Sequence, residues 1–134
     1  MTTRHAVCSC GQLDLTVEGE PSRIWICHCL ECQRRTGAVI GNMARFHREQ
    51  ISFNGTATAW KRRGESGNTL TCNFCPTCGS TVYFENEAFP EIVAVAVGNF
   101  ADPNFPAPMM SVWEETRHHW VSLPSDTKRM AKQG

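Results

Sequence analysis

The chain has 134 residues, the length of one domain with its own core, and its 13 basic and 13 acidic side chains leave a formal net charge of zero. Such a balance argues against a broad electrostatic footprint for nucleic acid, so we expect no nucleic-acid partner. No stretch reaches the roughly 18 consecutive apolar residues that a membrane-spanning helix needs, so we expect no membrane partner.

Strand patterns dominate the first half of the chain. Residues 7–10 lead into alternating apolar side chains over 13–17, which predicts a hairpin arm. The Asn-Gly pair at 54–55 is a strong tight-turn signal, so residues 56–60 are predicted to return from this turn as a strand. Only residues 30–36 favour a helical turn. Further strands are predicted at residues 23–27, 38–40, 43–46 and 51–53.

The second half continues this pattern, with strands predicted at residues 69–74, 81–84, 92–97 and 109–113. Three prolines, Pro103, Pro106 and Pro108, do not suit regular structure and predict a loop that crosses a sheet edge. The predicted fold class is therefore all-β, with short strands and long connections. Because there is no internal repeat and no charge block, we expect a single domain over residues 1–134 with several small apolar clusters.

The chain has eight cysteines, clustered at short spacings. Residues 1–5 lack the apolar stretch of a secretory signal, so we expect a cytoplasmic protein. Disulfides are rare in that reducing compartment, where clustered cysteines are more often metal ligands. We therefore interpret most of the cysteines as zinc ligands.

The most specific motif is Cys75-Pro76-Thr77-Cys78-Gly79. Two cysteines three residues apart on a tight turn can direct both sulfur atoms to one zinc ion. Pro76 fixes φ in the turn, and Gly79 can adopt a positive φ while nearby backbone N–H groups face the thiolates. The motif predicts a zinc knuckle.

Two further groups of cysteines precede this knuckle. Cys8 and Cys10 would place both sulfur atoms on one face of a strand and so form a second half-site. Cys27 and Cys29 share a face if strand geometry continues there, and Cys32 returns from the following turn. Three thiolates around one zinc leave an open position, and such a soft site prefers another thiolate as its fourth ligand. Chemistry on a thiol is therefore expected more readily than activation of water.

Cys72 leaves two arrangements open. As a fourth ligand beside Cys27, Cys29 and Cys32, it would give two closed four-cysteine sites with no catalysis. We predict instead that Cys72 is not a ligand, because a Cys-x-x-Cys unit from Cys72 to Cys75 would compete for a sulfur that the knuckle already uses. Spacing alone does not decide between the two arrangements.

Several charged and histidine side chains lie near these motifs. We expect His28, between two cysteines, to be packed or hydrogen bonded rather than to bind metal. Glu31 and Asp102 are candidate proton carriers, although carboxylates of this kind are more often solvated surface groups. The pair His118 and His119 can line a pocket mouth or simply lie on an edge strand. The candidates for binding a carboxylate are Arg34, Arg35 and Arg45.

The cysteine motifs follow one another along nearly the whole chain. They are Cys-x-Cys-Gly at residues 8–11, Cys-His-Cys-x-x-Cys at 27–32 with Thr-Gly at 36–37, Phe-Cys-Pro-Thr-Cys-Gly-Ser at 74–80, and a closing segment at 113–120. Together they resemble the glutathione-dependent formaldehyde-activating enzyme family, which includes centromere protein V. The resemblance implies a β-tent fold, in which small antiparallel sheets are stapled by zinc.

The resemblance also implies two zinc ions and a reaction. In the enzyme that names the family, glutathione is joined to formaldehyde, giving S-hydroxymethylglutathione, and the reverse cleavage of the carbon–sulfur bond makes the enzyme a lyase. The implied partner is a glutathione-like thiol or thiol adduct. The implied structural zinc ligands are Cys8, Cys10, Cys75 and Cys78, and those of a zinc with an open position are Cys27, Cys29 and Cys32.

Two classes of function remain open at this point. The first is a zinc-dependent carbon–sulfur lyase that acts on a thiol–aldehyde adduct. The alternative is a non-catalytic, zinc-stapled binding module with two closed cysteine sites. The ligand count at the second site separates them, because three ligands favour the enzyme and four favour the binding module.

Overall fold

The computed structural model of this chain describes residues 1–133, which form mostly strands with one short α-helix. The strands are β1 Thr3–Val7, β2 Asp14–Glu18, β3 Arg23–Cys27, β4 Gly41–His47, β5 Ile51–Asn54, β6 Thr58–Arg63, β7 Thr69–Phe74, β8 Thr81–Asn86, β9 Ile92–Ala96, β10 Met110–Val112 and β11 Lys128–Arg129. The helices are α1 Leu30–Thr36 and the 3₁₀ helices η1 Arg48–Gln50, η2 Val97–Phe100 and η3 Glu114–Thr116.

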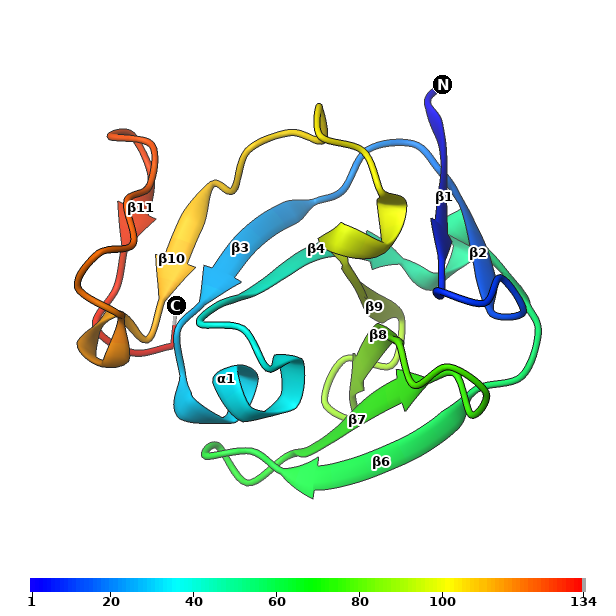
Figure 1. Cartoon of the computed structure of the whole chain (residues 1–134), viewed down its shortest axis with the longest axis horizontal. Coiled ribbons are helices and arrows are strands. Elements are labelled where there is room, and N and C mark those ends of the chain that lie inside the picture. Colours follow the sequence, from blue (N-terminus) through cyan, green and yellow to red (C-terminus); the bar gives the residue numbers. More distant parts are fainter. Residues whose placement is uncertain (134) are drawn as a thin grey trace.

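The strands form two sheets. A three-stranded sheet has the order β1-β2-β5, and an eight-stranded sheet has the order β11-β10-β3-β4-β9-β8-β7-β6. The large sheet curves, so that α1 lies on its inner side between β3 and the β6–β7 hairpin (Figure 1). The predicted all-β fold class is confirmed. Two pairings depart from the antiparallel pattern, since β10 runs parallel to both β3 and β11.

The prediction that the chain forms a hairpin at Asn54-Gly55, with residues 56–60 as the returning strand, is wrong. Strand β5 pairs with β2 in the small sheet, whereas β6 pairs with β7 in the large sheet, so the turn passes the chain between sheets. Gly55 has φ +93°, and a Cβ there would lie 1.9 Å from the Gln12 carbonyl oxygen. The glycine therefore permits a close backbone crossing rather than a two-residue hairpin.

The predicted strand at residues 38–40 is also wrong, because these residues form a bend after α1. The helix ends at Gly37, which adopts the left-handed conformation with φ +71°. The Ala38 N–H then donates to Thr36 Oγ1 at 3.0 Å, so local hydrogen bonding holds the bend. The next strand, β4, begins only at Gly41. The proline-rich segment over residues 103–108 is a loop, as predicted.

The central strands β4 and β9 of the large sheet pack apolar side chains on both faces and so separate two apolar clusters. The core is divided, as expected, but into two clusters rather than several small ones. In β4, Ala44 and Phe46 face the first cluster while Met43 faces the second, as the two-residue period of a strand requires. In β9, Val95 likewise faces the first cluster and Ala94 faces the second. The first cluster lies between the two sheets, and the second lies beneath α1. No helix within residues 1–133 combines the length and the apolar character needed to cross a bilayer.

Candidate functional site

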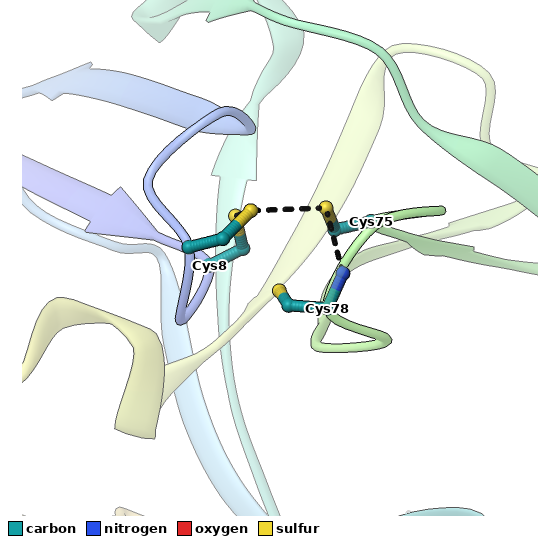
Figure 2. A group of neighbouring side chains, drawn as sticks. Cys8, Cys75 and Cys78 are labelled. Atoms are coloured by element: carbon teal, nitrogen blue, oxygen red, sulfur yellow. Dashed lines mark hydrogen bonds between the residues drawn. The ribbon is translucent and has the colours of Figure 1, made fainter.

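The first candidate site is the four-cysteine centre, formed by Cys8, Cys10, Cys75 and Cys78, whose Sγ atoms all lie within 4.8 Å of one another. The Cys10 Sγ lies 3.6 Å from both the Cys8 and the Cys75 Sγ. Figure 2 shows the side chains converging from two segments, the turn after β1 and the loop between β7 and β8. The resemblance implied this grouping, and the structure brings these four residues together.

The local reason predicted for the Cys8–Cys10 pair is wrong, because β1 ends at Val7 and both cysteines lie in a turn. In that turn the Gly11 N–H donates to the Cys8 carbonyl at 3.1 Å. Turn geometry, rather than strand alternation, therefore brings the two sulfur atoms to one side. The knuckle matches its prediction more closely, since Gly79 has φ +82° and its N–H donates to the Cys75 carbonyl at 2.8 Å.

Donors surround the sulfur atoms of the four-cysteine centre. Burial opposes ionisation of Cys75, but the Gln12 side-chain amide at 3.0 Å and the N–H groups of Cys78 and Thr77 lower its pKa to about 7. Hydrogen bonding with Ser80 lowers the pKa of Cys78 to about 5. Cys75 and Cys78 therefore favour the thiolate, the form that binds metal. For Cys10, the Gln12 N–H favours the thiolate, but burial and hydrogen bonds with the neighbouring thiols outweigh it and raise the pKa to about 11.

The second candidate site is the three-cysteine centre, formed by Cys27, Cys29 and Cys32, whose Sγ atoms also lie within 4.8 Å of one another. Strand geometry does not continue to Cys29 as predicted, because β3 ends at Cys27 and Cys29 is the N-cap of α1. As the cap, Cys29 Sγ accepts the Cys32 N–H at 3.3 Å. The start of a helix, rather than a strand face, gathers these three sulfur atoms.

The three thiols of this centre share their protons unequally. Hydrogen bonds from Cys27 and Cys32 hold the pKa of Cys29 well below its ordinary value. The reciprocal hydrogen bond to Cys29, together with burial, holds the pKa of Cys27 well above it. Three sulfur atoms gathered this closely can be held by one cation in place of the protons between them.

Both centres fit zinc. With sulfur about 2.3 Å from a tetrahedral zinc ion, ligand sulfur atoms stand about 3.8 Å apart. The separations of 3.6 Å in the four-cysteine centre agree with that value. Soft thiolate donors select zinc over hard cations such as magnesium. Four cysteines complete a tetrahedron, whereas the three of the second centre leave one position for another ligand.

Cys72 lies outside both groups of clustered sulfur atoms. It is buried in β7, with Trp60 and Phe84 as its neighbours on the adjacent strands. Burial raises the pKa of its thiol, which favours the neutral form. These observations support the prediction that Cys72 is not a ligand.

We expect elemental analysis of the purified protein to give about two zinc ions per chain, one for each centre. The Cys72→Ala variant should keep both ions and most of its stability, since Cys72 is not grouped with the other thiols. One ion or none in the parent, after expression with adequate zinc, would contradict the two-centre assignment. Loss of one ion in the variant would show that Cys72 closes the second centre.

A groove of about 910 Å³ runs between the two centres. At one end it is lined by Cys8 and Ser80 of the four-cysteine centre, and at the other by Arg35 and Gly41. A Cβ on Gly41 would lie 3.4 Å from the Cys32 Sγ, so this end of the groove adjoins the three-cysteine centre. The groove therefore reaches the neighbourhood of the three-cysteine centre, although Cys27, Cys29 and Cys32 do not line it.

The remaining candidates lie mostly away from the groove. Glu31 is an exposed carboxylate paired with Arg34 at 2.7 Å, and Asp102 accepts the Asn104 N–H at 2.9 Å. His118 contacts Gln33 rather than a cysteine, with 2.9 Å between Nε2 and Oε1. Among the three arginines, Arg35 lines the groove, whereas Arg34 and Arg45 do not.

His28 is fully buried and bonded, as expected, with 2.8 Å between its Nε2 and Ser111 Oγ. Sequence reasoning missed the residues that hold it. Thr116 Oγ1 donates to the His28 carbonyl at 2.8 Å, and Gln33 Nε2 donates to the same oxygen at 2.9 Å. These bonds fix the segment between Cys27 and Cys29. Gln33 lies close to His28 in sequence, but no local motif marks Thr116, which is 88 residues away.

Glu114 anchors this buried polar group. It accepts from Ser111 and pairs with Arg117 and Arg129, each at 3.2 Å. Burial of Glu114 opposes ionisation, but the Ser111 hydroxyl and the Arg129 guanidinium outweigh it and hold the pKa below its ordinary value. A depressed pKa means that the carboxylate stabilises the fold above its unfolded-state pKa and stops doing so as pH falls through the folded one.

We therefore expect Glu114→Gln to lower the free energy of unfolding by about 1–3 kcal/mol at pH 7, the usual effect of weakening buried hydrogen bonds to a charged group. Denaturant unfolding measured from pH 7 to pH 3 should show the two proteins converging at the acid end. Glu115→Gln is the matched control, because Glu115 is exposed. A constant difference across this pH range would contradict the role of the charge.

The chain has an all-β scaffold, one short helix capped by a cysteine, and two clusters of cysteines. These features define a class of small β-proteins with cysteine sites suited to a soft metal ion such as zinc. Residues 3–116 match the family described as glutathione-dependent formaldehyde-activating enzyme, and the chain belongs to that family. The predicted resemblance is thereby confirmed.

A crystal structure of a protein from Rhodobacter sphaeroides is similar to this chain, with a TM-score of 0.57 and 21% sequence identity. The alignment covers 76% of this chain and 90% of that one. At this identity the likeness shows a shared fold. No match to the sequence was found among curated proteins.

Proposed function

We propose that the protein is a zinc-dependent enzyme of the carbon–sulfur lyase type, which forms and cleaves the adduct of a small thiol with an aldehyde. The family description names glutathione and formaldehyde, which suits a thiol-type small-molecule partner. The observation that carries the proposal is the three-cysteine centre, where Cys27, Cys29 and Cys32 come together without Cys72. A closed fourth position would instead favour the binding module.

The reaction is a reversible addition. The thiol loses its proton, its sulfur forms a bond to the carbonyl carbon, and the carbonyl oxygen gains a proton. Cleavage reverses each transfer, so neither an oxidant nor a reductant takes part. A zinc ion held by three thiolates would lower the pKa of the substrate thiol and so favour the thiolate, which is the nucleophile.

The chain's own residues orient the centre and limit water around it. Cys29 stands at the helix start, where the Cys32 N–H keeps its sulfur in place. Met43, Val112 and the half-buried Trp113 pack against the cysteines and form an apolar surround. Trp113 holds a left-handed φ of 58°, which is strained for a bulky residue and typical of functional sites.

Two further features belong to the proposal. None of the eight cysteines forms a disulfide within the described residues, which suits the reducing cytoplasm that we propose as its location. We also propose that residues 1–134 act as one zinc-binding domain, in which the four-cysteine centre is structural and the three-cysteine centre binds the substrate.

The proposal is tested by exchange spectroscopy on the zinc-loaded protein with glutathione and formaldehyde. We expect interconversion of formaldehyde and its glutathione adduct to be faster than in buffer with the same amount of free zinc. S-methylglutathione, which lacks a thiol, should give no adduct at sulfur and serves as the control. A rate equal to that of the zinc-containing buffer would refute the proposed activity.

A further inference from the structure

The guanidinium of Arg35 lies in the groove with its hydrogen-bonding capacity unused by any carboxylate. Its central carbon stands 4.3 Å from the centroid of the Phe84 ring, a contact that holds the side chain over an aromatic face. Among residues 1–133 it forms no ion pair, whereas the neighbouring Arg34 is paired with Glu31. An arginine fixed in this way is pre-organised to bind an anion.

The position of Arg35 ties it to the three-cysteine centre. Its Nη2 atom and the Cys32 Sγ each lie 3.4 Å from the point that a Cβ on Gly41 would occupy, so they are at most twice that distance apart. A side chain at residue 41 would crowd both atoms. A thiol held beside Cys32 therefore brings a carboxylate a few bonds from its sulfur within reach of the guanidinium.

Asn42, the residue after Gly41 in β4, also lines the groove, but it does not join Arg35 at the three-cysteine centre. Its Oδ1 atom is buried, and the two-residue period of the strand directs its side chain to the face opposite Gly41 and Met43. Arg35 is therefore the charged group that the groove offers to a ligand at this end.

We infer that Arg35 is the specificity-determining residue of the site and selects amino-acid or peptide thiols that carry a carboxylate near the sulfur. The inference rests on the proposed function, because the ligand must place its thiol at the three-cysteine centre. Arg35 binds the carboxylate through paired N–H donors. Neutral thiols of the same size lose this interaction.

The test compares two probes that differ at a single group, N-acetylcysteine and N-acetylcysteine amide. Calorimetric titration of the zinc-loaded protein should show a preference of about tenfold for the carboxylate, in line with a hydrogen bond to a charged group. In Arg35→Gln this preference should disappear. In Arg34→Gln, the matched control one residue away, it should remain, because Arg34 is exposed and already paired.

Zinc content measured before and after each titration shows whether the variants keep both centres. If Arg35→Gln fails to fold, Arg35→Lys, which keeps the charge but not the paired donors, should show a reduced preference. Equal binding of both probes by the parent, or an unchanged preference in Arg35→Gln, would overturn the inference and leave the thiol site standing. Failure of the parent to bind either probe would overturn the proposed function together with the inference.

Discussion

Replacing Cys75 with serine should leave insoluble or molten protein. Cys75 is fully buried, and the four-cysteine centre joins segments 65 residues apart, as measured from Cys10 to Cys75. Metal binding at such a site is part of the folding free energy, and reaches about 10–16 kcal/mol in zinc-finger peptides. That range matches or exceeds the total stability of a typical domain, about 5–15 kcal/mol.

Circular dichroism and thermal unfolding of the Cys75→Ser variant provide the measurement, with zinc content determined in parallel. Cys72→Ser is the matched control, since it exchanges sulfur for oxygen at another buried position in the same hairpin. The control should lose only the roughly 1–3 kcal/mol that a buried hydroxyl without a new partner typically costs. A Cys75→Ser variant that melts like its parent would remove the structural role of the four-cysteine centre.

Replacing Cys32 with serine should abolish thiol–aldehyde exchange while leaving the sheets intact. The change removes one of three sulfur donors and puts a harder oxygen in its place, so the three-cysteine centre should lose its zinc. The cysteines of the other centre remain, and the protein should retain about one zinc ion per chain. We expect its exchange rate to fall to that of buffer.

Exchange spectroscopy and elemental analysis on the same preparation check this result. Cys72→Ser again serves as the control, because it removes a buried thiol outside the grouped cysteines and should keep both zinc and activity. Undiminished exchange in Cys32→Ser would place the reaction elsewhere. Loss of folding together with activity would show that the three-cysteine centre also has a structural role.

The sequence allowed the all-β class, most strands and the closely spaced cysteines to be predicted, because each depends on local signals. The Cys-x-x-Cys pair at Cys75 and Cys78 is read directly from its spacing, and residues 30–36 form the helix they were predicted to form. Grouping Cys8 with Cys75 required the family resemblance. Composition and spacing carry no information on which distant half-sites meet.

The remaining features depend on tertiary contacts. Asn54-Gly55 has the signal of a hairpin, but the crossing over Gln12 uses it to move the chain between sheets. The strand predicted at residues 109–113 forms as β10, but its parallel pairing with β3, far away in sequence, depends on the fold. The role of Arg35 was one possibility among three arginines, until the fold placed it beside Phe84 in the groove.

The two centres differ in how much of the chain must be made before each can form. The three-cysteine centre lies within residues 27–32, so its ligands leave the ribosome together and meet by closing a very short loop. The four-cysteine centre needs Cys8 and Cys78, and its second half arrives only after β7 has been made. Under the proposed function, the three-cysteine centre would therefore be able to acquire its zinc ion well before the four-cysteine centre is complete. A nascent chain in this interval would carry the substrate-binding zinc on an unfinished scaffold, exposed to the thiols of its surroundings.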